Sequence, residues 1–252
     1  RGGWVNPDNV KAALRADTLV VSVMHVNNET GVLQPLNKII DALADHEAFL
    51  HVDAAQGYGK ELDLLRAARI DLISVSGHKI YGPKGVGALV ARRRGFRKVP
   101  LTPLMFGGGQ EKGLRPGTLP TSLIVGLGKA AEIAVRDNNA RRRRNEAIRE
   151  MALRSLSSLD FCTNGDPERI IPHVLNVSFR GLDSEAAIVL LKDVASISNG
   201  SACTSQNYKP SHVLTAMGLE ADAIDGAVRF SWCHLTRDIG WNEIARRVQQ
   251  AR

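Results

Sequence analysis

The chain has 252 residues, of which 44% are hydrophobic and 23% charged, and its formal net charge is +7. This composition excludes an intrinsically disordered protein and is that of a folded chain large enough for two domains. The longest apolar stretch, residues 19–26, is interrupted by Ser22 and His25 and is far shorter than the roughly 18 residues that a membrane helix needs, so we expect no membrane association.

The first part of the chain alternates between predicted helices and predicted strands. Asn6 and Pro7 supply a helix cap and a first-turn proline, and Pro35 opens a second helix that we expect to end near Glu47. The apolar runs predict strands over residues 18–26, 49–53 and 71–76, with a short helix over 62–68. Because strands and helices alternate, the sequence favours a mostly parallel sheet covered by helices.

A long helical pattern over residues 121–159 leads into a second part of the chain. We place a domain boundary within this helix, so that residues 1–138 belong to a larger domain and residues 139–252 form a smaller α/β domain. A turn is predicted at residues 164–167, which read Asn-Gly-Asp-Pro. The other elements predicted for the smaller domain are strands over 173–179 and 227–232, a helix over 184–194 and a terminal helix.

Basic residues occur in short runs at positions 92–94, 97–98 and 141–144. Such runs attract acidic proteins or nucleic acid. They are also typical of the solvated side of a helix, and we favour that interpretation for residues 141–144.

The three cysteines are an odd number without paired spacing. This pattern argues against a disulfide framework and favours a reducing compartment, most simply the cytoplasm. We interpret Cys162 and Cys233 as inert, buried hydrophobic residues. Cys203 differs, because it lies in the segment Asn-Gly-Ser-Ala-Cys-Thr-Ser, whose small residues keep a thiol accessible.

The loop at residues 76–85 places Lys79 on a turn of small residues between two apolar runs, 72–75 and 86–90. We expect both runs to be buried strands, so that the loop emerges where a sheet presents its ends. Ligands of α/β sheets bind at such ends. A desolvated amine can be neutral there and form a Schiff base, which makes Lys79 a candidate catalytic residue. The spacing alone also fits an exposed lysine in a turn.

Two further residues lie at informative positions of predicted strands. Asp53 ends an apolar run, where a carboxylate can hold a protonated ring nitrogen, although it also fits a turn former or a helix cap. Arg229 alternates with Val228 and Phe230, so its guanidinium faces away from their apolar side and suits bidentate binding of a carboxylate. An ion pair with an acidic neighbour is the alternative for Arg229.

The order of several short motifs resembles that of the pyridoxal-phosphate-dependent cysteine desulfurases of the IscS/NifS group, in the class V aminotransferase family. The motifs are Met24–Glu29, Asp53–Gln56, Ser76–Lys79, Gly107–Glu111, Arg115–Thr118, Ser201–Ser205 and Val228–Ser231. The resemblance covers essentially the whole chain. It implies an α/β fold-type I transferase, similar to aspartate aminotransferase. Residues 1–138 would form part of the large domain that binds pyridoxal phosphate, and the small C-terminal domain would carry the nucleophilic cysteine.

The resemblance also implies a role for each site residue. Lys79 would tether the cofactor and transfer a proton, and Cys203 would be the nucleophile that receives sulfur. Pyridoxal 5′-phosphate would contact Asp53 at its ring nitrogen, Gln56 and Asn28 near its phenolic oxygen, and Ser76 and His78 at its phosphate, which Thr118 of a neighbouring subunit would also reach. Asn28 and Arg229 would bind the substrate carboxylate, and no metal is implied.

The implied activity converts L-cysteine to L-alanine and leaves a persulfide on the enzyme for delivery to an acceptor protein. The implied assembly is a homodimer. The acceptor would belong to iron–sulfur cluster assembly, tRNA thiolation or DNA phosphorothioation, so nucleic acid would take part only through the acceptor pathway. A related aminotransferase would have no use for Cys203. A non-catalytic scaffold, or a nucleic-acid-binding fragment of the same fold, is the alternative.

Members of this family carry a further N-terminal segment that supplies a histidine stacked on the cofactor ring and part of the phosphate site. The sequence has no counterpart for it, and His25 cannot replace that histidine because it matches another position of the family. We expect the sequence to be the retained part of a longer enzyme.

Overall fold

The computed structural model describes residues 2–199, 210–237 and 239–251. The chain divides into two compact units. The first, called here the three-stranded unit, comprises Arg1–Val5, Val26–Gln34 and Asn139–Arg252. The second, called the four-stranded unit, comprises Asn6–His25 and Pro35–Asn138.

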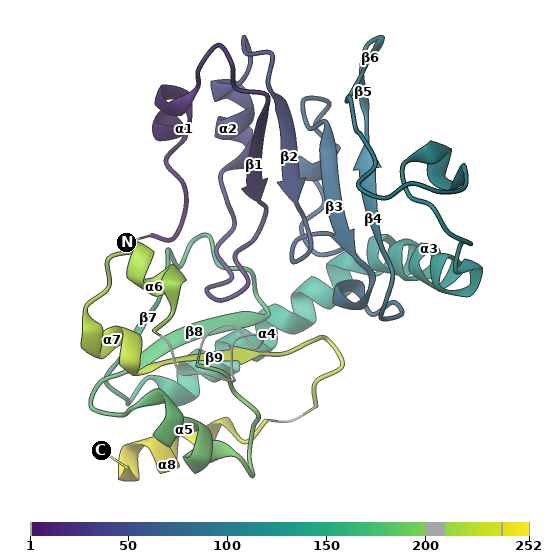
Figure 1. Cartoon of the computed structure of the whole chain (residues 1–252). Helices are drawn as coiled ribbons and strands as arrows, with labels where there is room; N and C mark the ends of the chain where they lie inside the picture. The colour runs from purple at the N-terminus through teal and green to yellow at the C-terminus, as the bar shows by residue number, and fades with distance from the viewer. Residues whose placement is uncertain (1, 200–209, 238, 252) are drawn as a thin grey trace. The chain divides into compact units, whose positions relative to one another are not determined.

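The four-stranded unit is built on a sheet in the order β1-β2-β3-β4 (Figure 1). Its strands are β1 (Val20–Met24), β2 (Phe49–Asp53), β3 (Leu72–Ser76) and β4 (Gly87–Ala91). The pairs β1–β2 and β2–β3 are parallel, as the alternating pattern predicts. The pair β3–β4 is antiparallel, because the short connection between them leaves no room for the crossover that a parallel pair requires.

Two helices, α1 (Pro7–Ala13) and α2 (Leu36–Ala42), lie beside β1 and β2 (Figure 1). The Asn6 side chain accepts a hydrogen bond from the Asp8 amide at 2.9 Å, so the predicted helix cap is confirmed. The core on this side of the sheet consists of Leu36, Ile39, Leu43, Leu50, Val52, Ala54, Leu65, Ile70 and Ile73.

Two predicted helices are shorter than expected. The predicted extension of α2 to Glu47 is wrong, because the helix ends at Ala42. The carbonyls of Leu43 and His46 instead accept hydrogen bonds from the Arg69 guanidinium, at 3.2 and 3.0 Å. The helix predicted over residues 62–68 is reduced to a 3₁₀ turn, η1 (Leu64–Arg66).

A strand does form near residues 86–90, but the prediction that it is buried is wrong. Residues Gly87–Ala91 do form β4, but every residue of the strand is exposed. Leu89 is 53% exposed and Val90 is 40% exposed. The reason is that, within the described residues, no element covers either face of β4 closely enough to bury it.

The remaining elements of the four-stranded unit follow β3 and β4. They are η2 (Gly77–Ile80), the hairpin strands β5 (Arg93–Arg94) and β6 (Arg97–Lys98), η3 (Gln110–Gly113) and α3 (Thr121–Arg136). The single long helix predicted over residues 121–159 is interrupted at Asp137, whose backbone leaves the helical region. A second helix, α4, then begins at Asn138. No helix within the described residues is long and apolar enough to cross a membrane.

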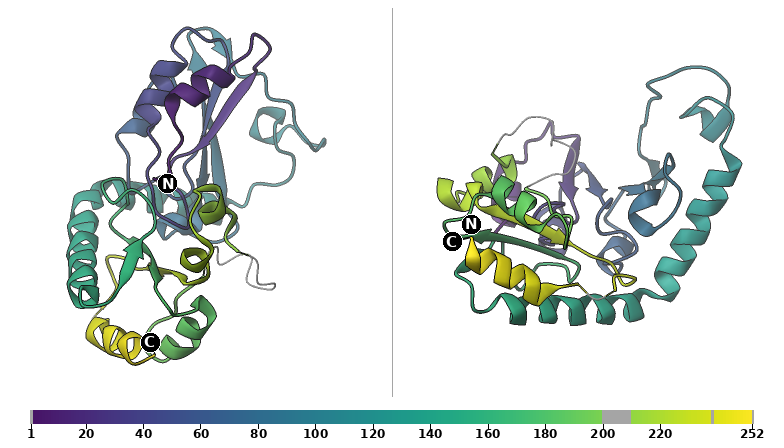
Figure 2. Two further views of the ribbon diagram at one scale, coloured as in Figure 1. Left: turned by 90° about the vertical axis from the view of Figure 1, so that its left-hand side faces the viewer. Right: turned by 90° about the horizontal axis from the view of Figure 1, so that it is seen from below.

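The three-stranded unit contains an antiparallel sheet flanked by helices, as Figure 2 shows. Its elements are α4 (Asn138–Leu156), β7 (Phe161–Thr163), β8 (Val174–Phe179), α5 (Ser184–Leu191), α6 (His212–Ala216), α7 (Ala221–Asp225), β9 (Ala227–Ser231) and α8 (Trp241–Gln250). Apolar side chains of β8 and β9 pack in one cluster with α4, α5 and α8. The three-stranded unit therefore has its own core.

Two sequence interpretations can be checked on the surface of this unit. The run of arginines lies on α4, where the predicted solvated helix side is confirmed for Arg142, Arg143 and Arg144, which are exposed, but not for Arg141, which is half-buried. The prediction that Cys162 and Cys233 are buried is wrong, because Cys162 is exposed and Cys233 is half-buried. Cys162 occupies the short strand β7, whose side chains are at most half-buried.

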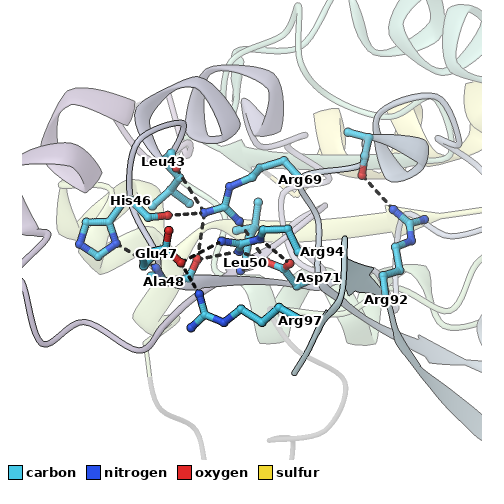
Figure 3. A network of polar contacts seen from close by, with 11 residues as sticks. Leu43, His46, Glu47, Ala48, Leu50, Arg69, Asp71, Arg92, Arg94 and Arg97 are labelled. Carbon is cyan, nitrogen blue, oxygen red and sulfur yellow. Dashed lines mark hydrogen bonds and ion pairs between the residues drawn. The ribbon is translucent and has the colours of Figure 1, made fainter. Parts of the chain in front are cut away.

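A polar network ties together the ends of β2 and β3 that lie away from the Lys79 loop (Figure 3). Asp71, only 1% exposed, accepts hydrogen bonds from Arg69 at 2.9 Å, from Arg94 at 2.7 Å and from the Leu50 amide at 2.8 Å. Burial, and then the positive charge of Arg94, lower the pKa of Arg69. The two guanidiniums therefore repel one another, and the Asp71 carboxylate between them offsets this repulsion.

Candidate active site

The candidate site begins at the edge of the four-stranded sheet where β2 and β3 end. Asp53 is the last residue of β2 and pairs in register with Ser74 of β3. Ser76 is the last residue of β3, and η2 carries His78 and Lys79 directly after it. Because parallel strands end at the same edge, the structure brings the carboxylate strand end and the lysine turn together, as the sequence predicts.

The chain turns sharply after Asp53. The Asp53 carboxylate accepts a hydrogen bond from the Ala55 amide at 2.9 Å, and the Ala54 amide donates to the Ser74 carbonyl at 3.0 Å. Gln56 follows on the same turn and is half-buried. These bonds hold Asp53 and Gln56 on one short segment beside the end of β3.

The His25 side chain packs against this turn. It is 1% exposed, and its amide donates to the Asp53 carbonyl at 2.8 Å. A Cβ atom at Gly57 would lie 2.1 Å from its Nδ1 atom, so the turn fits over the imidazole only with glycine at this position. Burial lowers the pKa of His25 to about 4, which keeps the ring neutral near pH 7.

This lowered pKa makes a prediction for acid stability. Between an unfolded pKa of 6.5 and a folded pKa of about 4, the unfolded chain binds a proton at His25 that the folded chain does not. The unfolding free energy should therefore fall by about 3 kcal/mol as the pH drops through this window. Urea unfolding of the full-length protein at pH 6.5 and pH 4 measures the fall, and H25Q should make it smaller. An equal fall in the unfolding free energy of wild type and H25Q would contradict the assignment of this loss to His25.

The turn after β3 supplies side-chain donors. The Ser76 hydroxyl and the His78 Nδ1 atom are 3.0 Å apart, and Lys79 next to them is half-buried. The Gly77 amide donates to the Val86 carbonyl at 3.0 Å, so this amide does not serve an anion. The side chains of Ser76 and His78 can bind an anion here.

A second lysine lies near Lys79. Burial, and then the positive charge of Lys79, lower the pKa of Lys60 to about 8. The Lys60 and Gly59 carbonyls each accept a hydrogen bond at 3.1 Å from the Asn138 side chain. A Cβ atom at Gly59 would lie 2.8 Å from the Ile80 side chain, so this segment packs directly on η2. The two amines are close enough to repel, and this repulsion is relieved when either one is neutral.

The donor set at this edge fits pyridoxal phosphate. A hydroxyl and an imidazole in hydrogen-bond contact can bind its phosphate, an amine can join its aldehyde, and a carboxylate at the end of the neighbouring strand can hold its ring-nitrogen proton. Lys79, Asp53, Ser76 and His78 would supply these groups, and Gln56 lies on the turn beside them.

The three-stranded unit holds the predicted carboxylate-binding residues. Arg229 lies on β9 between the buried side chains of Val228 and Phe230, 0% and 3% exposed, and is itself half-buried, so its predicted direction is confirmed. Its Nη1 atom donates to the Asn28 backbone carbonyl at 2.8 Å. The structure thus brings Arg229 and Asn28 together, through the backbone of Asn28.

Two predicted site residues remain to be located. Thr118 is exposed on the segment before α3, and its predicted contact with a neighbouring subunit remains a prediction. Cys203 lies outside the described residues.

Sequence reasoning gave no structural role to three residues that the structure places next to the predicted ones: His25 against the turn, Lys60 near Lys79, and the buried Glu29 next to Asn28. Each belongs to or closely follows a recognised motif. The sequence shows only that a polar residue lies in or near a motif. It does not show whether the side chain of that residue is buried.

Comparisons with known proteins agree with this geometry. The model of the aminotransferase class-V family matches residues 1–238. Cysteine desulfurase IscS of Vibrio campbellii (strain ATCC BAA-1116) is 43% identical over 251 residues, which are 99% of this chain and 61% of that protein. The chain thus spans about three fifths of the length of this curated relative.

Two solved structures share the fold. DndA from Streptomyces lividans is 48% identical with a TM-score of 0.81, over 92% of this chain and 65% of that one. SspA in complex with cysteine is 35% identical with a TM-score of 0.74, over 91% of this chain and 63% of that one. The predicted α/β fold-type I fold is confirmed by these similarities. The chain therefore belongs to the class V aminotransferase family, in the group of the IscS/NifS-type cysteine desulfurases.

Proposed function

We propose that the protein containing this chain is a pyridoxal-phosphate-dependent cysteine desulfurase, which converts L-cysteine to L-alanine and passes the sulfur to an acceptor. The observation that carries the proposal is the position of a carboxylate, Asp53, at the end of β2 and of an amine, Lys79, directly after the end of the neighbouring parallel strand β3. The similarity to SspA in complex with cysteine supports an amino-acid substrate of this kind.

When bound, pyridoxal phosphate supplies an electron sink that stabilises negative charge at the substrate Cα atom. Lys79 would hold the cofactor's aldehyde and move the proton at Cα, which requires its amine to be neutral for part of the cycle. Asp53 would keep the ring nitrogen protonated. Ser76 and His78 would fix the phosphate, so that the reacting atoms stay in place.

For the substrate carboxylate we propose Arg229, assisted by Asn28. The Arg229 guanidinium is planar and permanently charged, which suits two parallel hydrogen bonds to a carboxylate. Its hydrogen bond to the Asn28 carbonyl fixes one of its nitrogen atoms at 2.8 Å. The arginine is therefore oriented by the protein before the substrate arrives.

Cys203 would then take the sulfur. Its thiolate attacks the sulfur atom of the bound cysteine, a new S–S bond forms, and the bond between that sulfur and the substrate Cβ atom breaks. The electron pair of the broken bond stays with Cβ, which takes up a proton and becomes the methyl group of alanine. The products are alanine and a persulfide on Cys203, and no external oxidant is consumed.

The assembly and the partners are also proposals. We propose a homodimer in which Thr118 reaches the phosphate held by the other subunit. In support of this, Leu104, Met105 and Phe106, which precede Thr118, are 98%, 63% and 83% exposed, as apolar side chains at a subunit interface would be in one isolated chain. The acceptor would be a protein of iron–sulfur cluster assembly, tRNA thiolation or DNA phosphorothioation.

We further propose that residues 1–138 form part of the large cofactor-binding domain and that residues 139–252 form the small domain carrying Cys203. The proposed location is the cytoplasm, which the three cysteines without paired spacing favour.

An intact-mass spectrum of the full-length protein, recorded after incubation with pyridoxal phosphate and L-cysteine, tests the activity. The expected result is the addition of one sulfur atom that maps to Cys203, with release of alanine. The control is C203S, which should bind the cofactor and lack the adduct. A cofactor-loaded wild-type protein without the adduct would point to another reaction of this fold. Failure to bind the cofactor would support the non-catalytic alternative.

A further inference from the structure

A buried carboxylate lies directly beside the proposed substrate residues. Glu29 follows Asn28 in the chain and is 1% exposed. Its amide donates to the Asn27 side chain at 2.9 Å, and its carbonyl accepts a hydrogen bond from the Asn176 side chain on β8 at 3.2 Å. The backbone on both sides of the Glu29 side chain is therefore fixed without any help from its carboxylate.

The carboxylate itself makes a long-range contact. The Ser211 hydroxyl donates to Glu29 Oε2 at 2.5 Å, across 182 positions of the sequence. Ser211 is also the N-cap of α6, where the same hydroxyl accepts a hydrogen bond from the Leu214 amide at 3.2 Å. The start of α6 is thus held to the segment at residues 27–30 by a hydrogen bond to a charged acceptor, which is stronger than one between neutral groups.

Ser198 is held near the same place. The Ser198 amide donates to the Arg229 carbonyl at 3.2 Å, and the Arg229 amide donates to the Ser198 carbonyl at 2.6 Å. The Arg229 guanidinium in turn donates to the Asn28 carbonyl at 2.8 Å. Ser198 and Ser211, five residues before and eight residues after Cys203 in the sequence, are therefore both tied to residues that contact or adjoin Asn28.

We infer that Glu29 is a positioning residue for sulfur transfer: its hydrogen bond to Ser211 holds the C-terminal end of the Cys203-bearing stretch to the segment that presents Asn28 to Arg229. The inference rests on the proposed function. It assigns to Glu29 no contact with substrate, cofactor or reacting atoms. Glu29 acts through Ser211, which follows Cys203 by eight positions in the sequence.

The expected consequence is a separation of substrate binding from sulfur transfer. Holding a reactant close to its target raises its effective concentration, and loosening one end of its tether lowers it. Loss of the Glu29–Ser211 bond should therefore slow persulfide formation on Cys203. It should not weaken the binding of cysteine, because Arg229 and Asn28 keep their own hydrogen bond.

The test uses S211A in the full-length, cofactor-loaded enzyme, with two control variants. S211T keeps a hydroxyl that can both donate to Glu29 and cap α6. D183A removes the cap of another helix, α5, where the Asp183 carboxylate accepts hydrogen bonds from two amides at 2.8 and 3.1 Å. It therefore reproduces the loss of a helix cap without touching Glu29.

Three quantities are measured for each protein: kcat and KM for alanine release from L-cysteine, the rate of persulfide formation on Cys203 by mass spectrometry, and the rate of Cys203 alkylation by iodoacetamide without substrate. For S211A we expect kcat and persulfide formation to fall about tenfold, while KM and the alkylation rate stay within about twofold of wild type, since a small reagent reaches the thiol by diffusion. E29Q removes the charge but keeps an amide oxygen that can accept the Ser211 hydroxyl, so its kcat should fall between those of wild type and S211A, and S211T should behave like wild type. The exposed Cys162 provides an internal alkylation standard.

Several outcomes would overturn the inference. An S211A enzyme with wild-type kcat would show that the bond does not position the thiol. An equal fall in kcat for D183A would show that loss of a helix cap, and not the bond to Glu29, is responsible. A rise in KM without a fall in kcat would place Glu29 in substrate binding. If the wild-type enzyme itself forms no persulfide on Cys203, the proposed function fails together with the inference, and this result is distinct from the others.

Discussion

K79A should lower the release of alanine from L-cysteine by about 10³-fold or more, because acid–base catalysis by a positioned side chain alone contributes about 10²–10⁴-fold. Lys79 lies in η2, directly after the end of β3, and is half-buried beside a second lysine whose pKa its charge lowers. Alanine removes both the amine that would hold the cofactor and the base that would move the Cα proton. The rate is measured as alanine formed per minute by the full-length enzyme at saturating pyridoxal phosphate.

Two further variants make this test specific. Lys84 lies in the same loop and is exposed, so K84A should retain the wild-type rate. K79R keeps a positive charge at the site, but a guanidinium does not lose its proton in a protein, so this variant should be as inactive as K79A. The visible absorbance of the bound cofactor gives a second readout, because a Schiff base to Lys79 cannot form in either Lys79 variant. Activity above one tenth of wild type in K79A would rule out the proposed role.

The edge of the sheet that carries Lys79 could be predicted from the sequence for a physical reason. Apolar runs define where β2 and β3 end, and parallel strands end at the same edge. Asp53 and Ser76 therefore had to meet there if the two runs paired. The direction of Arg229 followed in the same way, since side chains alternate along a strand and Val228 and Phe230 had to face the core.

Features that depend on distant partners could not be predicted in this way. The apolar run in β4 suggested burial, yet its composition does not say whether another element covers the strand, and Leu89 is 53% exposed. The second helix ends early because the Leu43 carbonyl bonds to Arg69, 26 positions away in the sequence. Glu29 meets its partner across 182 positions. Local patterns contain no information about such contacts, which form only when the whole unit packs.

D71N should lower the unfolding free energy of the protein by about 3–5 kcal/mol, the usual cost of removing one partner from a buried ion pair. The Asp71 side chain is 2% exposed, and its partners Arg69 and Arg94 are 15% and 26% exposed. The burial and mutual repulsion that lower the pKa of Arg69 show that the two guanidiniums are unfavourable together without the carboxylate. Asparagine has nearly the same shape, so the loss measures the charge and not a cavity. Urea unfolding at neutral pH measures the change.

Two comparisons decide whether the buried charge is the cause. Glu47 pairs with Arg97 and Arg94 in the same network (Figure 3), but its side chain is 83% exposed, so E47Q should cost less than about 1 kcal/mol. The double variant D71N/R69M removes one of the two cations together with the anion. It should be more stable than D71N alone, because replacing both partners of a buried ion pair with apolar or neutral groups costs far less than leaving one charge uncompensated. If D71N/R69M is instead less stable by the sum of the two single losses, the network stabilises the sheet through packing and independent hydrogen bonds, and charge compensation is not its principal role.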